Sequence, residues 1–161
     1  MPLFTATFAG VAVSAAQDAF EITAPATSRV KVKEVRLGQY SDFGDAAAEI
    51  LSVTVLRGHT ASGSGGSAIT PGNMAGWSAA PAAVSAVEAN NTTVASGGSP
   101  VTLVADAFNI QQGWCWRAWE EYEEIILEVN QRLVVRLSAP IDPLTMNGTL
   151  LFEEIGKPPT N

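Results

Sequence analysis

The sequence predicts an all-β protein, an antiparallel sandwich of two sheets with about eight strands. Two observations predict this fold. Apolar and polar residues alternate with a period of two in many short segments, which is the pattern of half-buried strands. Clusters of Gly, Pro, Asn and Ser separate these segments at intervals typical of a sandwich. Helical patterning is weak, since only residues 41–49 and 119–124 have a composition that supports a turn or two of helix.

The segment 29–37 shows the strand pattern most clearly. Val30 and Val32 lie on one side of it, and the alternation slips at Glu34 before Val35 and Leu37 restore it. Such a slip predicts a β-bulge. Similar patterns predict strands at residues 3–13, 50–56, 84–94, 101–108, 125–129, 132–137 and 144–153.

Two dipeptides between or within these segments have turn chemistry. Asn130-Gln131 separates two predicted strands closely enough for a tight hairpin. Asn147-Gly148 is typical of a turn or a bulge. Both dipeptides therefore predict a turn or an irregularity in the strands of the C-terminal part of the chain.

The segment 58–83 is rich in Gly, Ser, Ala and Pro and resembles a linker between two domains. However, residues 1–57 hold too few strands for a stable core, and the strand pattern resumes unchanged after residue 83. We therefore expect one domain over residues 1–161, with a long internal loop at 58–83 and a tail at 156–161. Loops of that length are usually functional or are ordered by a neighbour.

Composition excludes several classes of function. The 161 residues carry 9 Lys and Arg against 16 Asp and Glu, a net charge of -7, whereas nucleic-acid binding needs a basic stripe. A single Cys and a single His are too few for a Cys/His metal site, and no catalytic pair can be named. We expect no enzyme activity, no cofactor and no metal. Only 16% of the residues are charged, which predicts that a partner covers part of the surface.

Membrane insertion and export are also not expected. No apolar run reaches the roughly 18 residues of a membrane-spanning helix. The first residues, Met-Pro-Leu-Phe-Thr-Ala-Thr-Phe, lack the basic segment of a signal peptide. The expectation is a soluble protein made in a cytoplasm.

Acidic residues cluster at positions 120–124 and 153–154. Spacing alone does not show the facing carboxyl pair of a glycosidase, so we interpret both clusters as a solvated acidic face. His59 opens the glycine-rich loop, where a pH switch is one interpretation and a surface or interface histidine with structural hydrogen bonds is the favoured one.

Tryptophans concentrate around the single cysteine. On a strand Trp114 and Trp116 share one face, and Cys115 points the other way. These rings belong either to the core or to a patch for a partner, because Trp and Arg are enriched at interface hot spots and Arg117 lies among them. A platform for stacking sugars is a third interpretation. The candidate interface residues are Arg57, His59, Trp77, Trp114, Trp116, Arg117 and Trp119.

Several segments resemble small proteins encoded among the head genes of tailed bacteriophages. The segments are 56–67 (Leu-Arg-Gly-His-Thr-Ala-Ser-Gly-Ser-Gly-Gly-Ser), Thr70-Pro71, 88–93, 133–135 and 144–150. Within that group the chain resembles capsid decoration, or cement, proteins. The resemblance implies a jelly-roll-like sandwich, a homotrimer, and a place on the outside of the head, where decoration proteins bridge subunits of the major capsid protein.

Symmetry makes such a role physically reasonable, because a trimer on a threefold axis engages several capsid subunits at once. We therefore expect a virion protein, made in the host cytoplasm, whose partners are its own copies and the major capsid protein. Neither nucleic acid nor a membrane is an expected partner. The alternatives are a head-fibre or receptor- and carbohydrate-binding module, and a tail-completion or tail-tube protein.

Overall fold

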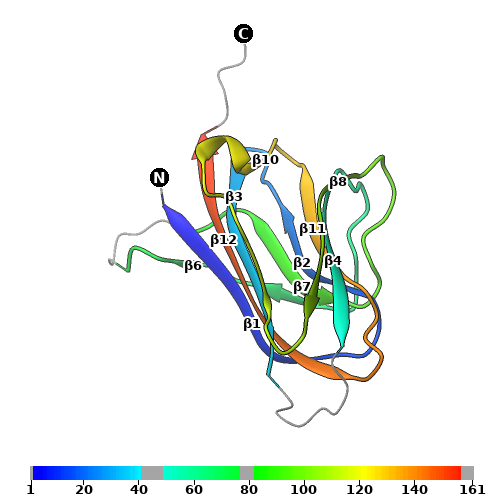
Figure 1. The fold of residues 1–161 in the computed structure, drawn as a ribbon. Coiled ribbons are helices and arrows are strands. Elements are labelled where there is room, and N and C mark those ends of the chain that lie inside the picture. The colour runs from blue at the N-terminus through cyan, green and yellow to red at the C-terminus, as the bar shows by residue number, and fades with distance from the viewer. Residues whose placement is uncertain (1, 41–48, 77–81, 157–161) are drawn as a thin grey trace.

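The fold is a sandwich of two antiparallel β-sheets (Figure 1), as a computed structural model describes it for residues 2–40, 49–76 and 82–156. Each sheet has six strands. Within the described ranges there is no helix with the length and hydrophobicity of a membrane-spanning segment. The two-sheet antiparallel sandwich expected from the alternation is confirmed.

The first sheet is built around three long strands. Its order is β10-β3-β12-β1-β6, and β9 pairs with β3 beside β10. Because β10 and β9 pair with successive stretches of β3, together they form one edge of this sheet. The strands are β1 (Leu3–Val13), β3 (Ser28–Gln39), β6 (Gly72–Asn73), β9 (Trp114–Arg117), β10 (Ile125–Leu127) and β12 (Leu144–Gly156).

The second sheet has the order β5-β7-β2-β11-β4-β8, so β5 and β8 are its edges. Consecutive strands β1 to β4 alternate between the two sheets, a connectivity found in jelly-roll-like sandwiches. The strands are β2 (Gln17–Thr23), β4 (Ile50–Arg57), β5 (Ser67–Ile69), β7 (Ala86–Asn91), β8 (Val101–Asn109) and β11 (Arg132–Leu137). A single 3-10 turn, η1 (Glu121–Glu123), lies among the described residues between β9 and β10.

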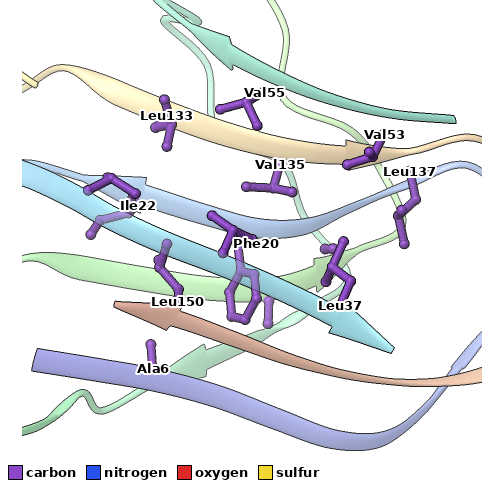
Figure 2. Close-up of a cluster of buried hydrophobic side chains, with 14 of the residues drawn as sticks. Ala6, Phe20, Ile22, Leu37, Val53, Val55, Leu133, Val135, Leu137 and Leu150 are labelled. Carbon is purple, nitrogen blue, oxygen red and sulfur yellow. The ribbon is translucent and has the colours of Figure 1, made fainter. Parts of the chain in front are cut away.

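The core lies between the facing sheets, as Figure 2 shows for its central side chains. Phe20 and Ile22 from β2 point toward Leu150 of β12 and Ala6 of β1. The Phe20 ring also packs against Phe8, with ring centroids 5.0 Å apart. Alternate residues of each strand supply this layer, which explains why a period of two was visible in the sequence.

The structure confirms the predicted bulge and corrects two predicted turns. The slip near Glu34 is a bulge, because the register of β12 against β3 shifts between Leu151 and Phe152. The prediction of a hairpin at 130–131 was wrong. β10 and β11 belong to different sheets, so the turn between them connects one sheet to the other. Asn147-Gly148 is not a turn either. Both residues lie inside β12, where a Cβ at Gly148 would overlap the Phe8 ring.

The strand β2 is the largest omission from the sequence prediction. It is an interior strand of the second sheet, between β7 and β11, and six of its seven residues are buried. Its polar residues Gln17, Asp18 and Glu21 broke the expected alternation. They are buried because neighbouring chain segments supply partners for them.

The segment 58–83 is more ordered than the expected loop. It contains β5, which pairs with β7, and β6, which pairs with the start of β1. Its first part crosses beside residues 92–98 through two isolated bridges, Ala61 with Ser96 and Ser64 with Thr93. The expectation of one long loop is therefore corrected for the described residues 58–76 and 82–83.

Candidate functional site

The tryptophan segment forms part of a sheet edge. β9 pairs with β3 in the register Leu37 to Trp114 and Glu34 to Arg117. Trp114 is buried, Trp116 is half-buried against the core, and Cys115 is exposed. The expected orientation, with both tryptophans on one face and the cysteine on the other, is confirmed, and the Trp114 ring belongs to the core.

Trp114 also connects the edges of the two sheets. Its indole Nε1 donates a hydrogen bond of 3.0 Å to Oδ2 of Asp106, which lies on β8. The Asp106 carboxylate accepts a second bond of 2.8 Å from the backbone N–H of Ala107. The hydrogen bond from Trp114, followed by that from Ala107, holds the pKa of Asp106 below its usual value.

Beyond β9 the chain exposes two aromatic rings. Trp119 is 80% exposed and Tyr122 is 84% exposed. Arg117 lies with its guanidinium 6.0 Å from the centre of the Trp119 ring, within cation–π range. We call Trp116, Arg117, Trp119 and Tyr122 the aromatic edge.

The backbone beneath the aromatic edge is held in place. Oε2 of Glu123 accepts hydrogen bonds from the backbone N–H groups of Trp119 (2.9 Å) and Glu120 (3.3 Å). Arg117 donates from Nε to Glu34 at 2.6 Å, which ties β9 to β3 through side chains as well. The exposed rings therefore stand on an ordered segment, where less conformational entropy is lost on binding.

The acidic cluster beside the aromatic edge is only partly solvated. Glu121 is exposed, but the Glu124 side chain is 6% exposed and lies between Lys31 and Lys33 of β3. Burial disfavours the charged form of Glu124, and the contacts with Lys31 and Lys33 outweigh that effect, so the pKa of Glu124 lies below its usual value. The expectation of a wholly solvated acidic face is therefore wrong at Glu124.

A small cavity of about 260 Å³ lies beside the aromatic edge, between β8 and the β9–β10 edge. Trp116, Arg57 and Glu123 contribute to its lining, together with apolar side chains of β8. Arg57 donates from Nη1 to the carbonyl oxygen of Ile126 at 3.2 Å, which orients its guanidinium. The structure thus brings two of the candidate residues, Arg57 and Trp116, to one place.

His59 lies apart from the aromatic edge and is buried, with 8% of its surface exposed. Among the described residues neither ring nitrogen has a hydrogen-bond partner, in contrast to the structural hydrogen bonds expected for it. Its carbonyl oxygen accepts from Arg132 at 3.3 Å. Trp77, the remaining candidate, lies outside the described residues.

The start of the glycine-rich segment is ordered by buried carboxylates of the same chain. Glu21 of β2 accepts from the Ser62 hydroxyl at 2.5 Å and from the Gly63 N–H at 2.9 Å, and it pairs with Arg132 at 2.6 Å. Gly63 allows this approach, because a Cβ there would lie 2.6 Å from the Thr93 carbonyl oxygen. Residues 61–64 therefore need no neighbouring molecule to order them.

Asp18 of β2 holds the backbone of the neighbouring segment at Ala95 in the same way. It is fully buried, pairs with Arg136 at 2.6 Å, and accepts from the Ala95 N–H at 2.6 Å. Sequence reasoning missed both carboxylates. The available signal was the pair of arginines at positions 132 and 136, on the outward side of a strand whose other residues are apolar.

No group of three or more His, Cys, Asp or Glu side chains among the described residues is arranged to hold a metal ion. The chain was also compared with models of protein families, with curated proteins and with solved structures. None of them matches.

Proposed function

We propose that the chain is a capsid decoration protein, which binds the outside of a tailed-phage head as a homotrimer and bridges subunits of the major capsid protein. The observation that carries the proposal is the aromatic edge. Two aromatic rings more than three-quarters exposed, with an arginine against one of them, have the composition of a binding hot spot. Exposed aromatic surface of this kind is typical of interaction sites.

The sequence resemblance to decoration proteins supplies the identity of the partner. The aromatic edge is suited to non-covalent binding of a protein partner. Trp119 and Tyr122 offer apolar area, and Arg117 offers directional hydrogen bonds. Ion pairs on β3 hold the supporting surface, so that binding needs little rearrangement. Many copies on a symmetric shell convert such modest contacts into stable attachment.

Binding to expanded, empty heads that lack decoration protein tests the proposal. We expect Trp119→Ala and Tyr122→Ala each to weaken binding by about 2 kcal/mol, or roughly 30-fold in Kd. Ile141→Ala is the matched control, because Ile141 is 84% exposed on the connection between β11 and β12, at the other end of the sandwich from β10 (Figure 1). Unchanged binding by both aromatic variants, with the protein still folded, would overturn the aromatic edge as the attachment site.

A carbohydrate-binding virion module is the second candidate. The cavity beside Trp116 favours it, because an aromatic ring, a guanidinium and a carboxylate line one hollow. A glycan array separates the two functions. Specific binding that is lost in Trp116→Ala supports the module, whereas no glycan binding together with attachment to empty heads supports decoration.

A further inference from the structure

Among the described strands, only β6 pairs with the outer edge of β1, and it covers a small part of that edge. β6 pairs only with Phe4 and Thr5, and no other described strand lies on that side of β1. The Leu3 carbonyl oxygen accepts from the N–H of Met74, so the backbone groups of Leu3 point away from β12. Backbone groups alternate in direction along a strand, so those of Thr7 point outward as well.

A groove of about 400 Å³ runs along this part of β1, between it and β5 and β7 of the other sheet. Its described lining contains no charged side chain. Phe8 and Ile69 make part of it apolar, and Gln17 and Asn90 lie in it as a buried amide pair, joined by a hydrogen bond of 2.9 Å. The site therefore combines unpaired backbone groups with an uncharged hollow for alternate side chains, which is what an added strand requires.

The outer edge of β8 is a second edge with no partner among the described strands. The Ser138 N–H donates to the Ser52 carbonyl oxygen, so the backbone groups of Ser52 face β11 rather than β8. Ala107 lies opposite Ser52, so its carbonyl oxygen faces away from β4, while its N–H donates to the Asp106 carboxylate at 2.8 Å. The backbone groups of Ala105, two residues earlier, also face away from β4. No described strand pairs with β8 on that side.

Charge indicates which molecule these edges meet. Each copy carries a net charge of -7, so two copies repel unless they meet on faces that lack acidic side chains. The groove along β1 is such a face. β8 carries one charged residue, Asp106, whose carboxylate already accepts hydrogen bonds from Trp114 and Ala107. An open edge with no lysine or proline is otherwise a liability for a soluble chain.

We propose that β1 of one copy, from Thr7 onward, pairs with β8 of a second copy and extends one sheet across the contact. The two surfaces differ, so the contact is heterologous, and repetition of it closes a ring of three when each copy is rotated by a third of a turn relative to the last. The inference rests on the homotrimer in the proposed function and names its subunit contact. It does not depend on attachment to a head.

Proline variants at the two edges test the pairing by sedimentation velocity. Thr7→Pro and Ala105→Pro each remove an N–H that makes no hydrogen bond to a described strand, so neither breaks a pairing between the described strands. We expect wild type to sediment as three chains and each variant alone as one chain. An equimolar mixture should form a heterodimer, because each variant retains the edge that the other has lost.

Two further variants control for misfolding. Ala12→Lys and Ala107→Lys place a charge at the same two edges and should give the same dissociation and the same complementation in the mixture. Near-UV circular dichroism of the tryptophans reports whether each variant is folded.

Four results would overturn the pairing. The first is a wild-type protein that sediments as a monomer, and the second is a trimer that persists in each of the four single variants. The third is an equimolar mixture of a β1 variant and a β8 variant that stays monomeric. The fourth is dissociation of the trimer by the β1 variants only. The last of these would indicate contact between two β1 edges. Because no head is present, these results are separate from those of the head-binding assay.

Discussion

Glu21 provides the sharpest test of how the glycine-rich segment is held. Its carboxylate is 3% exposed and contacts Ser62, Gly63 and Arg132 at 2.5 to 2.9 Å. Glu21→Gln keeps the size of the side chain but removes its charge. The Arg132 side chain, 15% exposed, then has no carboxylate to pair with at this position.

The expected cost follows from this burial. Breaking a buried ion pair by removing one partner costs about 3–5 kcal/mol, because the other charge is left uncompensated. Arg132 retains one hydrogen bond, to the His59 carbonyl oxygen, so we expect the low end of that range, about 3 kcal/mol. In a domain of this size that corresponds to a fall in Tm of about 6–12 °C.

Urea unfolding measures the loss, and amide hydrogen exchange locates it. Glu88→Gln is the matched control, since Glu88 is half-buried beside the same Ser62 and is expected to cost less than about 1 kcal/mol. Protection of the Gly63 and Ser64 amides should fall in Glu21→Gln only. A destabilisation within about 1 kcal/mol of the control, or unchanged protection of those amides, would refute the conclusion that Glu21 orders this segment.

Two further predictions concern packing and charge. Gly66→Ala should destabilise by about 1–3 kcal/mol in urea unfolding, because its Cβ would overlap the Ala89 carbonyl oxygen, whereas Gly38→Ala, with open space around it, should be near neutral. For Glu124, whose folded pKa is depressed, the stabilising contribution is present above its unfolded pKa near 4.5 and is lost as pH falls through the lower folded value. The destabilisation by Glu124→Gln should therefore be larger at pH 7 than at pH 3, and an equal loss at both values would contradict this.

Some local features could be predicted from residue order alone. Trp114, Cys115 and Trp116 show this, since a strand places alternate residues on opposite faces whatever lies around it. The bulge near Glu34 was visible for the same reason, because an extra residue shifts the alternation. Asn130 and Gln131 show the limit of such reasoning. Their turn was recognisable, but whether it joins strands of one sheet or of two depends on pairing with distant strands.

The candidate site was predicted only in part. The tryptophans and Arg117 were found from composition, while Tyr122 was missed because a single tyrosine between glutamates has no distinctive pattern. The burial of Glu124 was missed as well. Its two lysine partners lie on β3, more than 90 residues earlier, and nothing in the order of residues 120–124 distinguishes it from its exposed neighbours.

By itself, the sequence determined the fold class and the inward face of most strands, because alternation with a period of two is a local property of the chain. Tertiary structure alone decided where charge could be buried. Asp18 and Arg136 lie 118 residues apart, and their pairing makes a polar strand an interior strand of its sheet. Tertiary structure also decided which strand edges have no partner among the described strands. Local alternation records burial on the two faces of a strand, whereas the backbone groups along its edges are the same in every residue except proline.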